Sequence, residues 1–184
     1  MILRTAKRRG LDGIAVTDHG TIKGAEAVAR QNDDARLAVV IGSEITTDEG
    51  GEIIGLFLNR EVSSGPAASV IKAIHDQGGV AIAAHPGDIL RHHFRELPSG
   101  LDAYESFNGR CVLPFLNNRA HRLGMSKGLA AVGGSDAHFT FEIGNVVTDV
   151  RGGLKEAIRK GNTRVSGTIR YAIPGNLRTI LRRI

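Results

Sequence analysis

Short apolar runs alternate along this chain with longer amphipathic segments, and this alternation restricts its possible folds more than any other feature. The apolar runs predict strands, and the amphipathic segments, several of which are followed by glycine, predict helices. The predicted strands occupy residues 12–20, 36–47, 51–58, 79–87, 101–109, 129–138, 145–150 and 163–167, and the predicted helices 2–10, 21–33, 65–79, 112–128 and 154–162. Strands separated by helices predict parallel β/α units, in a barrel or in a doubly wound sheet.

Polar residues that can bind metals or take part in catalysis stand near the ends of five of these apolar runs. In a barrel of parallel β/α units, the carboxyl ends of the strands converge on one mouth, so such residues would meet there. The residues are Asp18 and His19, Glu44, His85, Asn108, and Asp136 with His138.

This set of imidazoles and carboxylates is the kind of donor set that zinc, manganese and iron(II) take. The chain has a single cysteine, Cys111, which excludes an internal disulfide and a thiolate cluster. A residue such as Asp136 could instead simply cap a turn. Five potential ligands at equivalent places in four units nevertheless favour a metal site. For the other histidines we expect surface or packing roles, with His92 and His93 as the two that could still face the mouth; they are His75, His92, His93 and His121.

The chain has 184 residues and a formal charge of +5, with arginines and lysines gathered near both ends. Such a charge fits nucleic acid, an anionic substrate or a solvated surface. Few aromatic residues and no tryptophan give weak support for the stacking of single-stranded bases. No apolar run approaches the length of a membrane span, and the basic residues 7–9 precede no apolar signal segment, so we expect a soluble cytoplasmic protein.

Six short stretches together resemble the successive signatures of the PHP (polymerase and histidinol phosphatase) superfamily. They are "AVTDHGTIKGAE", "IGSEITT", "AAHPG", "ESFNGR", "NNRA" and "GGSDAHFTFEIG". The resemblance covers nearly all of the chain up to about residue 150. It implies an α/β fold, a distorted (β/α)7 barrel that holds up to three divalent metals at its C-terminal mouth, and most commonly a phosphoesterase activity.

The resemblance also implies roles for individual residues. The residues that fall on family metal ligands are His19, Glu44, His85, Asp136 and His138, with Glu44 as the expected bridge between metals. Asp18 would orient a ligand or the backbone. Asn108, Arg110 and Asn117 lie near the mouth, where Arg110, and more weakly Arg91, would bind a phosphate oxygen.

The chain departs from the family pattern at its beginning. Family members start with a strand that carries a His-x-His pair, and this sequence contains no such pair. We therefore expect a barrel without its first strand and with fewer than three metals. We expect an incomplete sequence of a longer protein, although a domain that has lost the pair is the alternative. Residues 1–184 are expected to form a single PHP-like domain, in which 151–184 is a basic C-terminal extension.

These observations predict a phosphoesterase that uses zinc, manganese or iron to activate water against a small phosphorylated metabolite or nucleotide. One alternative is a non-catalytic barrel that binds RNA, as a ribonuclease P protein subunit of related fold does. Another alternative is a metal-dependent hydrolase of C–N bonds.

Overall fold

A computed structural model describes residues 1–111 and 113–169 as an α/β fold. The elements follow in the order α1 (Ile2–Arg8), β1 (Gly13–Val16), α2 (Lys23–Arg30), β2 (Ala38–Thr46), β3 (Glu52–Leu56), α3 (Ala67–His75), β4 (Val80–Ala83), β5 (Ala103–Asn108), α4 (Pro114–Ser126), β6 (Ala130–Gly134), η1 (Thr140–Glu142), β7 (Val146–Val150), α5 (Leu154–Lys160) and β8 (Thr163–Gly167). Every predicted helix and strand within the described residues is confirmed. Residues 170–184, the last part of the expected basic C-terminal extension, lie outside them.

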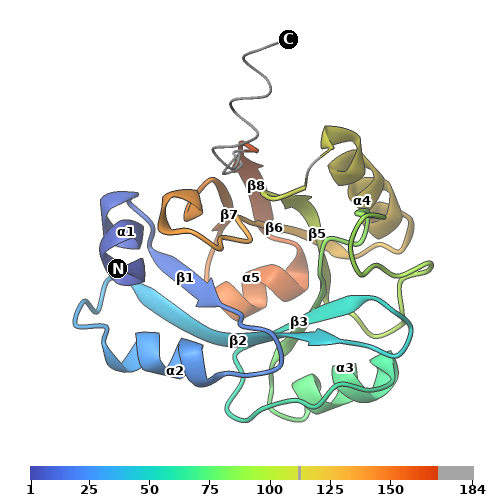
Figure 1. Ribbon diagram of the computed structural model, residues 1–184, viewed down its shortest axis with the longest axis horizontal. Helices are drawn as coiled ribbons and strands as arrows, with labels where there is room; N and C mark the ends of the chain where they lie inside the picture. The colour runs from blue at the N-terminus through green and yellow to red at the C-terminus, as the bar shows by residue number, and fades with distance from the viewer. Residues whose placement is uncertain (112, 170–184) are drawn as a thin grey trace, which may run out of the picture.

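The first six strands form one sheet in the order β1-β2-β3-β4-β5-β6, and β7 and β8 form a separate pair. The sheet curls into half of a barrel around α5, whereas α2 and α3 lie outside it (Figure 1). The β1–β2, β4–β5 and β5–β6 pairs are parallel, as the alternation predicted. Neighbouring strands form hydrogen bonds along their length because their polar backbone groups must be paired when they are buried.

The prediction of parallel pairing is wrong for the middle of the sheet. β3 runs antiparallel to both β2 and β4, and β7 runs antiparallel to β8. No helix separates β2 from β3; a five-residue connection with two adjacent glycines joins them. A connection this short can only reverse the chain, since a parallel pair needs a crossover of a dozen or more residues.

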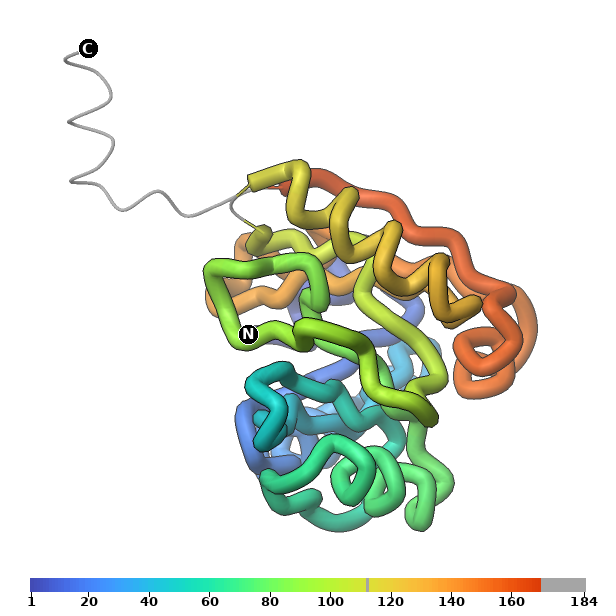
Figure 2. Tube along the Cα trace, turned by 90° about the vertical axis from the view of Figure 1, so that its right-hand side faces the viewer, coloured from blue at the N-terminus to red at the C-terminus, as the bar shows by residue number. Residues whose placement is uncertain are grey.

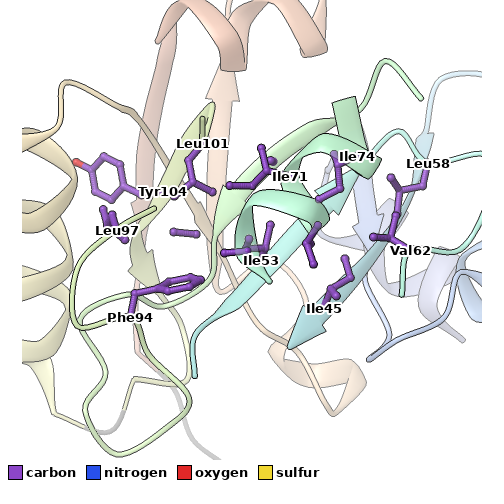
Figure 3. Close-up of a cluster of buried hydrophobic side chains, with 14 of the residues drawn as sticks. Ile45, Ile53, Leu58, Val62, Ile71, Ile74, Phe94, Leu97, Leu101 and Tyr104 are labelled. Atoms are coloured by element: carbon purple, nitrogen blue, oxygen red, sulfur yellow. The ribbon is translucent and has the colours of Figure 1, made fainter. Parts of the chain in front are cut away.

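The two faces of the sheet bury two apolar clusters. The larger one joins the outer face to α3 and to the long β4–β5 connection, through Ile45, Ile53, Ile74, Phe94 and Tyr104 among others (Figure 3). The smaller cluster lies on the concave face and includes Val40, Leu56, Val80, Ile82 and Ile158 of α5. Since side chains alternate between the faces of a strand, the polar residues of the concave face lie in line with this second cluster.

The two ends of the fold are built by different parts of the chain. α4 lies close to β8 at one end, whereas the segments from α2 to α3 lie at the other end (Figure 2). β7 and β8 both pack beside β6, so the pair continues the curvature of the sheet. No helix among the described residues is long and apolar enough to span a membrane.

Candidate metal centre

The β2–β3 hairpin places two carboxylates on the same face of the sheet. Thr46 pairs with Glu52 in the antiparallel register, and Glu44 lies two residues before Thr46. Paired residues of neighbouring strands point to the same face, and so do residues two apart on one strand. Glu44 and Glu52 therefore both point to the concave side, where their side chains are buried. Sequence analysis missed Glu52 because it stands at the start of a strand and not at the end of one.

His85, two residues after the end of the neighbouring strand β4, completes this group. Its Nε2 atom lies 3.0 Å from Oε1 of Glu44 and 3.3 Å from Oε2 of Glu52. Donor atoms of these three buried residues lie within 4.8 Å of one another, which is compatible with a single metal ion between them. We call Glu44, Glu52 and His85 the carboxylate–imidazole triad.

In the absence of a metal, a proton is expected on the imidazole of the triad. Burial alone would lower the pKa of His85, but its hydrogen bonds to Glu44 and Glu52 raise it to about 9. Burial would likewise raise the pKa of Glu52, and the hydrogen bond with His85 and the nearby imidazoles lower it to about 2. The Nδ1 atom of His85 is buried and has no partner among the described residues. We therefore expect the metal-free triad to hold a proton on His85, beside its two carboxylates.

Two further imidazoles approach the triad from the solvent side. His19 lies just beyond β1, and its Nε2 and Nδ1 atoms are 3.8 Å and 3.7 Å from Glu44 and Glu52. His92 lies in the β4–β5 connection, and its Nδ1 atom is 3.5 Å from Oε1 of Glu52. Among the described residues, every basic group within ion-pairing distance of Glu44 or Glu52 is a histidine. This side of the site therefore holds carboxylates without a permanent positive charge.

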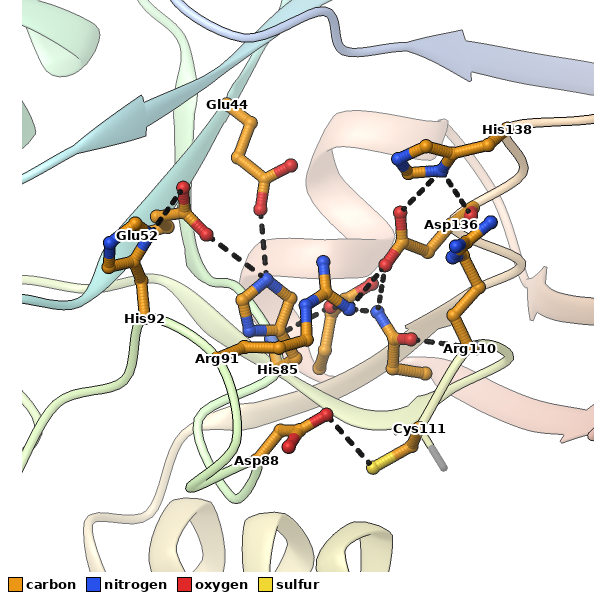
Figure 4. A network of polar contacts seen from close by, with 12 residues as sticks. Glu44, Glu52, His85, Asp88, Arg91, His92, Arg110, Cys111, Asp136 and His138 are labelled. Atoms are coloured by element: carbon orange, nitrogen blue, oxygen red, sulfur yellow. Dashed lines mark hydrogen bonds and ion pairs between the residues drawn. The ribbon is translucent and has the colours of Figure 1, made fainter. Parts of the chain in front are cut away.

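A second cluster lies beside the triad and is built around Asp136, which follows β6 (Figure 4). Oδ2 of Asp136 accepts a 2.6 Å hydrogen bond from Nη1 of Arg91 and a 3.2 Å bond from Nδ2 of Asn108. The nearby Nδ1 of His138 is 3.6 Å from Oδ1 of Asp136. The structure thus brings Asp136 and His138 together as predicted, but the cation that Asp136 contacts is the guanidinium of Arg91.

Glu105 on β5 lies buried behind both clusters. Its Oε2 accepts hydrogen bonds from the backbone N–H of His85, at 2.8 Å, and from Nδ2 of Asn108, at 3.0 Å. Burial raises the pKa of this carboxyl to about 7, against a smaller opposing effect of His85. Sequence analysis missed Glu105 as well, although it lies three residues before Asn108 on the concave face of a predicted strand.

Glu142 in η1 anchors the loop that carries His138. Its Oε2 accepts hydrogen bonds from the backbone N–H groups of His138 and Phe139, at 2.8 Å and 3.0 Å. The same oxygen accepts a 3.4 Å bond from Nη1 of Arg110. Arg110 is thus linked to the loop that carries His138, and its guanidinium is partly exposed. Glu142 is a third residue that sequence analysis did not identify.

The predicted residues Asp18 and Asn117 contact the backbone of the site. The backbone oxygen of Asp18 accepts hydrogen bonds from Ser43 Oγ and from the N–H of Glu44, whereas its carboxylate lies over Gly24. The side-chain amide of Asn117 binds both the N–H and the C=O of Asn108. Both residues thus orient other residues of the site.

Backbone strain is concentrated in the same region. His85 and Asp136 have φ angles of 27° and 48°, which residues with a Cβ seldom adopt. Such conformations cost free energy and persist where the surrounding structure imposes them, and they are common at functional sites.

The donor set of the triad fits a divalent metal ion. Two buried carboxylates face one imidazole, and their donor atoms converge on one point. Two carboxylate oxygens and an imidazole nitrogen are ligands that zinc, manganese and iron accept, and such a site leaves coordination positions open for substrate. The histidines that border it, His19 and His92, could add further nitrogen ligands.

Comparison with known proteins agrees with this description. Residues 114–163 match the family model described as PHP-associated. The uncharacterized protein MJ1587 of Methanocaldococcus jannaschii is 48% identical over 122 residues, which cover 65% of this chain and 71% of that protein.

Two solved structures share the fold. One is a two-domain protein of Bacteroides vulgatus that contains a predicted PHP-like metal-dependent phosphoesterase, with a TM-score of 0.74 and 20% identity over 91% of this chain. The other is the lesion-specific endonuclease PfuEndoQ of Pyrococcus furiosus, with a TM-score of 0.55 and 14% identity over 89% of this chain. The matched region spans only 60% and 52% of those two proteins.

Proposed function

Because the chain belongs to the PHP superfamily, we propose that it is a metal-dependent phosphoesterase that acts on a small phosphorylated metabolite or a nucleotide. The observation that carries the proposal is the carboxylate–imidazole triad, whose three donor groups are buried and converge within 4.8 Å. Burying two carboxylates next to each other is costly unless a cation compensates them. A site of this kind is therefore expected to select a divalent metal.

The residues around the triad suggest how an ester would be bound. When bound, a divalent metal supplies a Lewis acid and lowers the pKa of a coordinated water. Glu44, Glu52 and His85 would hold the metal, with His19 and His92 as additional ligands. Arg110 would bind a phosphate oxygen, because a guanidinium donates paired hydrogen bonds to such oxygens.

The second cluster would serve orientation and proton transfer. Asn108 holds Asp136 through its amide, and the ring of His138 lies half exposed beside it. An imidazole in this place can donate a proton to the leaving oxygen of the ester. We propose that Arg91 balances the carboxylate of Asp136 through their ion pair, and that a metal at Asp136 and His138 would require Arg91 to move. Asp18 would act through Glu44, whose backbone it holds.

The test is a panel of phosphate mono- and diesters incubated with the protein and manganese, zinc or iron. We expect turnover that is lost in the Glu44→Gln and Glu52→Gln variants. It should be retained in Lys127→Met, which removes an exposed ion pair between the end of α4 and Glu96. The panel should include amides and lactams, because their hydrolysis would instead support a C–N hydrolase. If no ester is hydrolysed with any of these metals, the proposal is wrong.

An RNA-binding barrel without catalysis is the weaker candidate. The basic charge of the chain favours it, but the concave face presents buried carboxylates at the mouth. Carboxylates repel a phosphate backbone unless a metal neutralises them. A purely binding barrel gives no physical reason to bury them there.

A further inference from the structure

Two phenylalanines form an exposed stacked pair directly after the second cluster. The rings of Phe139 and Phe141 are 5.5 Å apart between centroids and nearly parallel, at 10°. Their exposed fractions are 54% and 50%, so each ring leaves much of its surface in contact with water. Single exposed hydrophobic residues are common, but two adjacent rings at the rim of a polar site form a continuous apolar surface.

The loop that carries this aromatic pair is held in place by buried groups. Glu142 is 2% exposed and binds the backbone N–H groups of both His138 and Phe139. Phe141 is fixed from the other side, since its backbone oxygen accepts a 2.9 Å hydrogen bond from Nη2 of Arg9 at the end of α1. Pre-organisation of this kind lowers the entropy cost of binding a ligand on the rings.

Cationic side chains border the aromatic pair. Arg9 contacts Phe141, and Arg110 shares the Glu142 oxygen with the backbone of Phe139. His138, next to Phe139 in the chain, touches Asp136 of the second cluster. The loop that carries this flat apolar surface thus contacts two guanidinium groups, and the surface begins one residue after His138 of the candidate ester site. Aromatic rings next to arginines are the combination that binds nucleobases with their phosphates.

We propose that Phe139 and Phe141 form a platform on which a nucleobase of the substrate stacks. The inference rests on the proposed phosphoesterase function and narrows its substrate class, from any small phosphate ester to a nucleotide or the single-stranded end of a nucleic acid. Arg9 and Arg110 would bind the neighbouring phosphates. Stacking of this kind is tolerant of base identity, because every base has a π face.

The platform can be tested without hydrolysis. Binding of a fluorescently labelled single-stranded oligonucleotide is measured by anisotropy in EDTA and low salt, next to an abasic strand of equal length and charge. The oligonucleotide and its abasic counterpart form the first arm of the experiment. A labelled mononucleotide and labelled ribose 5-phosphate form the second arm, which shows whether the platform binds a free nucleotide or needs a strand. We expect the base-containing ligand to bind about 10-fold or more tightly than its abasic counterpart in at least one arm.

Variants assign this preference to the two rings. Phe139→Ala and Phe141→Ala should each reduce it several-fold, whereas Phe139→Trp, which keeps a stacking surface, should preserve it. Met125→Ala is the matched control, because Met125 is an exposed apolar residue on α4. Equal binding of base-containing and abasic ligands by the unmodified protein would overturn the proposal. So would a preference that survives both alanine substitutions, or binding of neither ligand.

Failure of the platform is distinguishable from failure of the phosphoesterase function. Hydrolysis of ribose 5-phosphate and of a nucleoside monophosphate is compared in the same metal. Hydrolysis of both at equal kcat/KM, with no base-dependent binding, overturns the platform alone. Base-dependent binding in EDTA with no hydrolysis of any ester supports the platform and contradicts the phosphoesterase proposal.

Discussion

The two halves of the candidate site neutralise their carboxylates in different ways. In the second cluster, Asp136 is held by the guanidinium of Arg91 and the amide of Asn108. In the triad, Glu44 and Glu52 face only imidazoles within ion-pairing distance, among the described residues. A guanidinium keeps its charge at any ordinary pH, whereas an imidazole does not.

This difference indicates where a metal ion would bind first. The proton on His85 is replaceable, so a divalent cation can enter the triad by displacing it. At Asp136 an incoming metal would have to displace the hydrogen-bonded side chain of Arg91. A guanidinium cannot make room by losing a proton, because it stays charged at ordinary pH. We therefore infer that the triad is the primary metal site. The carboxylate of Asp136 in the second cluster is already paired with Arg91, and this cluster would contact the substrate.

The largest expected effect separates the two clusters by metal affinity. Glu52→Gln should weaken manganese binding by about 100-fold or more, because removal of a direct ligand costs at least as much as removal of an outer-shell partner. Asp136→Asn should weaken it less than about 10-fold, since Asp136 lies outside the triad. Isothermal titration calorimetry on both variants measures the difference. An equal loss in the two would erase the distinction between the clusters.

The pH dependence of stability probes the carboxyl behind both clusters. The pKa of Glu105 is raised to about 7 by burial, from an ordinary value near 4.5. The native state therefore binds more protons between these two values, and stability falls as pH rises from 4.5 to 7 and then levels. Glu105→Gln should remove this fall. Its free energy of unfolding, relative to that of the unmodified protein, should therefore rise by about 3 kcal/mol between pH 4.5 and pH 8.

Urea unfolding of the metal-free protein at several pH values measures this gain. Gln is a suitable replacement because its oxygen can accept the same two hydrogen bonds, from His85 N–H and Asn108. A variant whose stability follows the pH curve of the unmodified protein would show that Glu105 is charged in the native state.

Metal affinity should itself depend on pH through His85. Its pKa is raised to about 9 by the hydrogen bonds to Glu44 and Glu52, so the proton must leave before a metal binds. Affinity should rise about 10-fold per pH unit from pH 7 and level near pH 9, with about one proton released per metal. Calorimetry in two buffers of different ionisation enthalpy counts that proton. Affinity that does not change over this range would mean that His85 carries no proton to displace.

The smallest effect concerns the pair that neutralises the second cluster. Arg91→Met should destabilise the metal-free protein by about 2 kcal/mol, because it leaves the partly buried carboxylate of Asp136 without its cation. Lys127→Met breaks a surface ion pair of nearly equal length, in which Nζ of Lys127 lies 2.7 Å from Oε1 of Glu96. This change should lower the free energy of unfolding by less than about 1 kcal/mol. Equal losses measured by urea unfolding would show that burial does not distinguish the pairs.

Comparison of sequence and structure shows which parts of the site were predictable. His19, Glu44 and His85 follow or end buried apolar runs, and the rule that strand ends converge brought them together correctly. That rule assumes parallel strands, so it could not find Glu52, which enters the site from the start of an antiparallel strand. The signal was present in "TTDEGGEI", where two adjacent glycines link two apolar runs with no helix between them.

Residues buried behind the mouth were harder to predict. Glu105 lies within a predicted strand and Glu142 lies between two predicted strands. Nothing in their spacing distinguishes a buried carboxylate from a solvated one. Their roles depend on contacts between segments distant in the chain, such as the hydrogen bonds of Glu105 to His85 and of Glu142 to Arg110. Such contacts follow from packing and not from local sequence.

The most direct test of the central claim is the metal content of the protein, measured by native mass spectrometry after loading with a divalent metal and dialysis against metal-free buffer. We expect about one equivalent of tightly bound metal in the unmodified protein. We expect its loss in a Glu44→Gln, Glu52→Gln double variant that remains folded. Metal retained undiminished by the double variant, or none bound by the unmodified protein at pH 8, would contradict the assignment of the triad as the metal centre.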